Sequence, residues 1–229
     1  MKVTKKLKKA LCAGLAGCLI LGCLAGCGGT KEKVFSGPKD KNCTSYVIPK
    51  GVTKIGDSAF YKCGALTSIE IPDGVTEIGQ QAFYGCRALT SIEIPNSVTE
   101  IVDNAFWDCK SLTSIEIPNV VKEICNFVFI DCESLTNIEI PDGVTKIGER
   151  AFSGCKSLTS IEMPNSVTVI GANAFNGCKS LTSIEIPKNV TEIGGWAFNG
   201  CSSLKTIKVP QGMDVSNWGL DEGVQVIYY

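Results

Sequence analysis

The chain repeats itself every 23 residues, and this period constrains its fold more than any other feature. Leucines and prolines keep the interval, from Leu66 to Leu204 and from Pro49 to Pro210. So do seven cysteines, which are Cys63, Cys86, Cys109, Cys132, Cys155, Cys178 and Cys201. A fixed period between about 20 and 50 residues is typical of a solenoid, in which each unit buries its apolar side chains by stacking on its neighbours. The sequence therefore predicts one continuous repeat structure rather than several globular domains.

One unit, residues 72–94, shows the pattern within the period. Ser91-Ile92-Glu93-Ile94 alternates polar and apolar residues before Pro95, which predicts a strand with both isoleucines inward and Glu93 outward. Residues 75–78 predict a second, shorter extended piece, and residues 80–86 leave room for about one helical turn. The side chains expected in the core of this unit are Val75, Ile78, Ala82, Phe83, Cys86, Leu89, Ile92 and Ile94.

The repeated pattern C-x-x-L-x-x-I-x-I-P-x-x-V-x-x-I-G-x-x-A-F resembles the BspA-like leucine-rich repeat. The resemblance covers residues 49–209 as seven full repeats, with an N-terminal cap at 42–48 and a C-terminal cap at 210–229. It implies a right-handed repeat solenoid over residues 42–229, mainly β with short helical turns. Members of this family are commonly bacterial surface proteins that bind host proteins or other cells, so the resemblance also implies an adhesion or protein-binding role.

The N-terminus is typical of an export signal. Five lysines precede an uncharged apolar stretch, residues 10–25, which is shorter than the ~20 residues that a membrane-spanning helix needs. Leu24-Ala25-Gly26-Cys27 resembles the lipobox of bacterial lipoproteins, which implies a signal peptide at 1–26 and lipidation of Cys27. Cys18 ends a similar motif with too short an apolar stretch, and the alternative is a cleaved signal with a free Cys27. The resemblance places the protein outside the cytoplasm, anchored by lipid at the bacterial cell surface, with residues 27–41 as a tether.

Charge and residue types exclude several classes of function. Without residues 1–26 the chain has 17 basic and 23 acidic residues, a formal charge of −6, so we expect no nucleic acid partner. The chain has no histidine, which removes Ser-His-Asp and Cys-His pairs and makes a structural zinc site improbable. The sequence therefore predicts a protein that is not an enzyme and holds no cofactor or metal. A hydrolase that uses carboxylates alone is the remaining catalytic alternative.

The repeat cysteines are predicted to be buried free thiols that fill the core. Adjacent strands lie about 4.8 Å apart, whereas bridged Cβ atoms need about 3.8 Å, so neighbouring units would have to distort to form a disulfide. Strained or partial bridging is the alternative. Cys125 differs, because it replaces a turn glycine such as Gly148, as Val102 does one unit earlier. It is interpreted as a tolerated substitution, with a reactive thiol as the alternative.

Two rows of side chains are candidates for binding a partner. The first row is acidic and lies on the predicted outer face of the sheet: Glu70, Glu93, Glu116, Glu139, Glu162 and Glu185. The second follows each repeat phenylalanine and is apolar for four units: Tyr61, Tyr84, Trp107 and Ile130. The acidic row suits a basic partner, but it also fits a solvated face, and divalent cations bridging carboxylates are a third interpretation. The second row fits either an interface or an edge half-buried against the next turn.

The sequence thus favours a lipid-anchored, extracytoplasmic leucine-rich repeat protein that acts as a non-catalytic protein-binding or adhesion module. The expected partner is a protein or cell-surface ligand, with the membrane contacted through the lipid anchor. The alternative is a passive structural protein of the envelope with no specific ligand.

Overall fold

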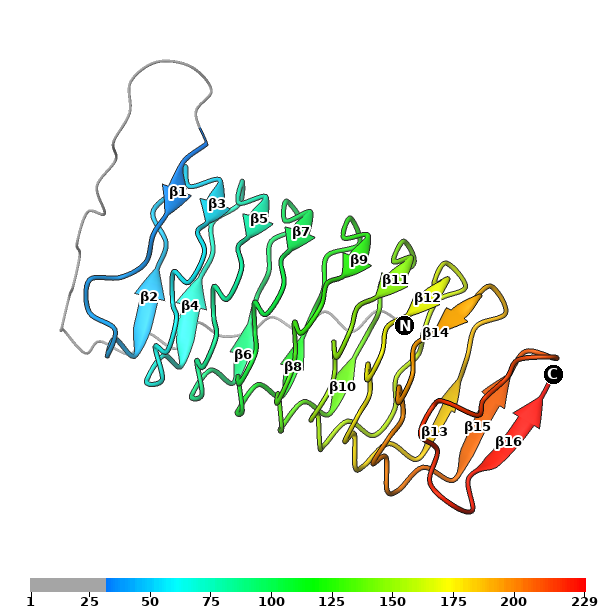
Figure 1. Cartoon of the computed structure of the whole chain (residues 1–229). Coiled ribbons are helices and arrows are strands. Elements are labelled where there is room, and N and C mark those ends of the chain that lie inside the picture. Colours follow the sequence, from blue (N-terminus) through cyan, green and yellow to red (C-terminus); the bar gives the residue numbers. More distant parts are fainter. Residues whose placement is uncertain (1–31) are drawn as a thin grey trace, which may run out of the picture.

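The computed structural model describes residues 32–229 as one parallel β-solenoid, in which successive turns of the chain stack along an axis. Each turn contributes up to two short strands, and Figure 1 shows these as two rows along the solenoid. The described part of the chain contains no helix, so none in it is long and apolar enough to cross a membrane. The signal peptide and Cys27 lie outside the described residues.

The first row holds the shorter extended piece of each unit. Its strands are β1 (Val34–Phe35), β3 (Lys54–Ile55), β5 (Glu77–Ile78), β7 (Glu100–Ile101), β9 (Glu123–Ile124), β11 (Lys146–Ile147), β12 (Val169–Ile170) and β14 (Glu192–Ile193). They form two four-stranded sheets, β1-β3-β5-β7 and β9-β11-β12-β14. All pairs are parallel and in register, so Ile147 lies beside Ile170 and equivalent side chains form ladders.

The second row holds the strands that the alternating pattern predicted. They are β2 (Ser45–Val47), β4 (Ser68–Glu70), β6 (Ser91–Ile92), β8 (Ser114–Ile115), β10 (Asn137–Ile138), β13 (Ser183–Glu185), β15 (Thr206–Val209) and β16 (Gln225–Tyr228). They form three sheets, β2-β4, β6-β8-β10 and β13-β15-β16. The unit at 141–163 lacks a strand in this row, but Glu162 still bridges to Glu139. The predicted parallel solenoid with a 23-residue repeat is therefore confirmed.

The expected helical turn at residues 80–86 is wrong. Gln81 and Gly85 have positive φ angles of 56° and 70°, which a right-handed helix does not allow. The backbone N–H groups instead alternate between two kinds of partner. That of Ala82 donates to Gly79 in its own turn at 3.2 Å, and that of Phe83 donates to Ala105 in the next unit at 2.8 Å. Residues 80–86 and their equivalents in the other units form a further side of the solenoid, here called the turn edge. Hydrogen bonds to the neighbouring unit along this edge replace those that a helix would make within its own turn.

The core is a continuous apolar column between the two rows and the turn edge. Seven phenylalanines from Phe60 to Phe198 are fully buried, and their rings stack with centroids 5.2–5.7 Å apart. The repeat leucines and isoleucines lie in the same column. Burying one large apolar side chain is worth about 1.5–3 kcal/mol, so the stability of the solenoid is distributed over many equal layers.

The repeat cysteines are buried and free, as predicted. The Sγ of Cys155 donates a hydrogen bond to the backbone carbonyl of Phe129 at 3.2 Å. The same contact recurs from Cys86 to Cys201 at 3.1–3.3 Å. Each thiol therefore fills a small space in the core and satisfies a carbonyl of the preceding unit.

Both ends of the column are closed by aromatic side chains. At the N-terminal end, Phe35 and Tyr46 pack on Phe60 with centroid distances of 5.5 Å. Phe35 belongs to β1, so the structure adds a strand to the segment at 27–41 that the sequence suggested as a tether. At the C-terminal end, Trp218 is buried against Phe198, and β16 forms the closing strand expected at residues 223–229.

Candidate partner-binding surfaces

The six glutamates of the acidic row, here called the glutamate strip, are all exposed. The parallel register places their carboxylates side by side on the outer face of the second row, because Glu139 pairs with Glu162 and each unit repeats the same position. At about 5 Å and full water screening, each neighbouring pair repels by about 0.8 kcal/mol. The strip is therefore a narrow surface of one charge sign that runs along most of the solenoid.

The strip ends differently at its two sides. Val47, which is 66% exposed, pairs with Glu70 at the N-terminal end. Lys208 lies beside Glu185 at the other end, and its Nζ donates to a carboxylate oxygen at 3.2 Å. Within residues 32–229, this is the only ion pair that a member of the strip makes. The one ion pair that the strip makes in this part of the chain is thus with a lysine, which illustrates the kind of group that the strip accommodates.

Three members of the second candidate row form a continuous stack, here called the aromatic stack. The rings of Tyr61 and Tyr84 are parallel with centroids 4.9 Å apart, and Trp107 meets Tyr84 edge-on at 5.3 Å. All three side chains are half-buried on the turn edge, so each ring presents only part of its surface to solvent. Lys62 Nζ lies 5.2 Å from the Tyr61 centroid. Half-buried aromatic rings of this kind combine large apolar area with little conformational freedom.

Ile130 does not extend this surface. The sequence placed it in the same row, but the side chain is only 7% exposed and belongs to the core. Its unit also has Val128 where the other units have alanine, and both side chains are buried on this edge. The exposed apolar row is therefore limited to the three aromatic residues of the N-terminal half.

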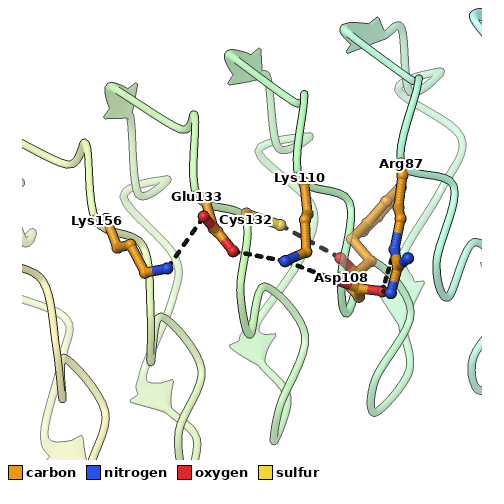
Figure 2. A network of polar contacts seen from close by, with 7 residues as sticks. Arg87, Asp108, Lys110, Cys132, Glu133 and Lys156 are labelled. Atoms are coloured by element: carbon orange, nitrogen blue, oxygen red, sulfur yellow. Dashed lines mark hydrogen bonds and ion pairs between the residues drawn. The ribbon is translucent and has the colours of Figure 1, made fainter.

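A chain of ion pairs runs beside the aromatic stack, and sequence reasoning missed it. Figure 2 shows Asp108 between Arg87 and Lys110, and Glu133 between Lys110 and Lys156. The closest atoms lie 2.7 Å apart in the Arg87–Asp108 and Lys110–Glu133 pairs and 3.0 Å apart in the Glu133–Lys156 pair. The missed signal was the 23-residue spacing of Arg87, Lys110, Glu133 and Lys156, which places four charges in one ladder with one sign reversed.

These contacts shift the pKa of three groups, Arg87, Lys110 and Glu133. Hydrogen bonds from Lys110 and Lys156 lower the pKa of the Glu133 carboxyl. The hydrogen bond to Glu133 raises the pKa of Lys110, and that to Asp108 raises the pKa of Arg87. Both shifts favour the charged forms of Arg87 and Lys110. The chain of pairs largely neutralises itself and leaves the glutamate strip as the more strongly charged surface.

Within residues 32–229, the surroundings of the cysteines favour neither metal ligation nor thiol reactivity. No group of three metal-ligating side chains occurs within residues 32–229. Burial raises the pKa of Cys125 to about 11, so its thiol stays protonated at neutral pH, although the residue is partly exposed. A protonated thiol is a poor nucleophile, which favours the interpretation of Cys125 as a substitution without redox chemistry.

Comparison with known proteins identifies the family. The BspA type leucine-rich repeat region matches residues 31–134 and 122–219, in six copies. The chain therefore belongs to the BspA-type leucine-rich repeat family. No curated protein matches the chain.

Solved structures support the same assignment. The leucine-rich repeat protein of T. pallidum is 33% identical with a TM-score of 0.72, over 78% of this chain and 86% of that one. A leucine rich cell surface protein of Faecalibacterium prausnitzii A2-165 is 32% identical with a TM-score of 0.53, over 80% of this chain and 59% of that one. The pneumococcal vaccine antigen PcpA, at 23% identity, a TM-score of 0.52 and coverage of 73% and 51%, shares the fold.

Proposed function

We propose that this protein is a lipid-anchored, extracytoplasmic repeat protein that binds a protein or cell-surface ligand and performs no catalysis. The observation that supports this most is the glutamate strip, since six carboxylates of one sign are held in register on an open face, and within residues 32–229 only Glu185 forms an ion pair. Such a surface attracts a basic partner and increases its rate of encounter.

Membership of the BspA-type family is consistent with this role. One similar structure is described as a leucine rich cell surface protein, which supports a location at the surface for this chain as well. The lipobox-like Leu24-Ala25-Gly26-Cys27 would attach the protein there. With the anchor at residue 27 and the column closed by Phe35, the solenoid would stand close to the membrane.

Charge reversal on the strip tests the binding role. Glu70, Glu116 and Glu162 are alternate members of the strip, and all three are replaced by lysine in one variant. The fold is expected to be retained, because the lysines at positions 116 and 162 each lie between two glutamates and the lysine at position 70 lies beside Glu93, which replaces repulsion by attraction. Binding of the purified protein to bacterial cells, host cells or matrix is then measured and is expected to fall.

A matched control separates the strip from net charge. Glu100, Glu149 and Glu192 are exposed and lie away from the strip, so their replacement by lysine changes the net charge equally. This control is expected to bind as the original protein does. If neither the original protein nor the control variant binds any cell or matrix above background, the passive structural alternative is the better description. If both triple variants bind normally, the ligand does not use the strip.

The anchor is tested separately in the bacterium. A Cys27→Ala variant is expected to lose incorporation of labelled fatty acid and to leave the membrane fraction. A Cys18→Ala variant serves as the control and is expected to retain both. If fatty acid is still incorporated by the Cys27→Ala variant but not by the Cys18→Ala variant, the lipidated residue is Cys18 and not Cys27.

A further inference from the structure

The first row of strands is interrupted at one place, between β7 and β9. The four-stranded sheets on either side are each continuous, but within residues 32–229 no strand pairing connects Glu100–Ile101 with Glu123–Ile124. At other junctions the glycine that follows the strand donates to the isoleucine of the preceding unit, as Gly148 does to Ile124 at 2.7 Å. Among the described residues, the equivalent bond from Cys125 to Ile101 is absent.

The cause is the pair of residues that stand where the other units have glycine. A Cβ added to Gly171 would lie 2.5 Å from the backbone nitrogen of Glu149, and one added to Gly194 would lie 2.3 Å from that of Ala172. A side chain at this position would therefore come too close to the backbone of the unit below unless the two units shift apart. Val102 still donates to Ile78 at 2.9 Å, so a single side chain above Gly79 is accommodated without loss of the pairing. Cys125 stands on Val102, and at that junction the pairing is lost.

The core is also looser at this junction. The Phe106 and Phe129 ring centroids are 5.7 Å apart, the widest spacing in the stack. A small apolar gap, too narrow to hold a water molecule, lies at the same place, and its lining includes Ile101, Cys125 and Val128. The wider ring spacing and this gap indicate that the two units pack less closely on this side of the column.

The other sides of the same junction are intact. In the second row, β8 pairs with β10. On the turn edge, the backbone N–H groups of Phe106 and Asp108 donate to Val128 and Ile130 at 2.9 and 2.8 Å. The Lys110–Glu133 ion pair joins the two units there as well (Figure 2). The second row has interruptions of its own, after β4 and after β10, but the first row is continuous at both.

We propose that the junction between residues 95–117 and 118–140 is a built-in hinge, which opens along the first row while the second row and the turn edge hold the two units together. The opening breaks no strand pairing, and on this side of the described junction it strains only the hydrogen bonds that Asn126 donates to the Asp103 carboxylate, at 2.8 Å from the backbone N–H and 3.4 Å from the side-chain amide. The aromatic stack lies wholly on the N-terminal side of this hinge, whereas the glutamate strip crosses it. Opening therefore tilts the two halves of the glutamate strip relative to each other about the intact β8–β10 pairing, without altering the aromatic stack.

Amide hydrogen exchange tests the hinge, and the repeat supplies matched internal controls. Amides of residues 122–125 are expected to exchange at least about tenfold faster than those of 99–102 and 145–148, which occupy the same positions in neighbouring units. Amides of Phe106 and Asp108, on the hinge side, are expected to stay as slow as Phe83 and Gly85. Fast exchange on both sides of the junction would contradict a hinge, because it would mean that the whole unit unfolds.

Two substitutions at one position separate the Cβ from the thiol. Cys125→Gly removes the colliding Cβ, so exchange of residues 122–125 is expected to fall to within about twofold of the neighbouring units. Cys125→Ala keeps the Cβ and is expected to stay fast. If Cys125→Gly does not fold, Val102→Gly removes the other side chain of the contact and is expected to slow exchange in the same way. Equal protection of all three segments in the unmodified protein would overturn the proposal.

Discussion

Replacing Phe152 by alanine tests whether the phenylalanine stack is the core that stabilises the solenoid. Phe152 is fully buried, and its ring stacks between those of Phe129 and Phe175 with both centroid distances at 5.5 Å. A buried Phe→Ala change costs about 3–5 kcal/mol, and each aromatic pair adds about 0.5–1.5 kcal/mol beyond its buried area. Because two pairs are lost together, we expect a loss near the upper end, about 5 kcal/mol, which is a large fraction of the stability of a typical protein.

Urea denaturation followed by far-ultraviolet circular dichroism measures this change as a difference in the free energy of unfolding. Ser153→Ala is the matched control, since Ser153 is the next residue in the same turn but lies outside the column. Its effect is expected to stay within about 0.5 kcal/mol. A loss below about 1 kcal/mol for Phe152→Ala would show that the phenylalanine stack is not the stabilising core, because a cavity in a dry, closely packed stack costs more free energy than that.

Three further predictions concern backbone fit and ionisation. Gly171→Ala is expected to destabilise the protein by about 1–3 kcal/mol in the same denaturation assay, because the new Cβ would lie 2.5 Å from a backbone nitrogen. Gly195→Ala is the control, since the atom nearest to its new Cβ would lie 3.7 Å away, and it is expected to change stability by less than about 0.5 kcal/mol. Burial raises the pKa of the repeat thiols, to about 12 for Cys201, so their stabilising effect is complete below the unfolded pKa of about 8.5 and is lost as the pH rises toward 12. The free energy of unfolding, measured by urea denaturation in reducing buffer, should therefore fall between about pH 8 and pH 10. Cys155→Ala should make that fall shallower by up to about 1.4 kcal/mol per pH unit. Lys110 and Lys156 lower the pKa of Glu133, so the stability that this carboxylate contributes is present above an unfolded pKa of about 4.3 and is lost as the pH falls below it. Glu133→Gln should therefore weaken the dependence of the thermal unfolding temperature on pH in the acid range. An unchanged dependence would show that the ion pairs do not stabilise the fold.

The repetitive part of the structure could be predicted from the sequence because each core position occurs seven times at the same interval. Phe83, Cys86 and Leu89 are buried as expected, and the in-register stacking follows from the constant period. The glutamate strip could be predicted for the same reason, since Glu93 alternates with Ile92 and Ile94 on a strand. Periodicity fixes which side of the chain faces inward, and a parallel register then aligns the outward residues.

The turn edge could not be predicted in the same way. Residues 80–86 have a composition that also fits a helical turn, and the features that decide against it, the positive φ angles of Gln81 and Gly85 and the bonds to the next unit, are visible only in the structure. Ile130 occupies a row that is polar or aromatic elsewhere, and its burial depends on local packing rather than on its place in the repeat. The interruption at β7 and β9 depends on two successive substitutions, Val102 and Cys125, whose combined steric effect appears only when one unit is placed on the other.

The central claim is that identical units stack in register around one dry column that contains the thiols. Labelling of the folded protein with a bulky thiol reagent, read by mass spectrometry for each cysteine, tests it most directly. We expect five thiols to remain unlabelled in native protein and to react fully after denaturation, because each is completely buried: Cys86, Cys109, Cys132, Cys155 and Cys178. Rapid labelling of these five thiols in folded protein would contradict the stacked column and the surfaces that depend on it.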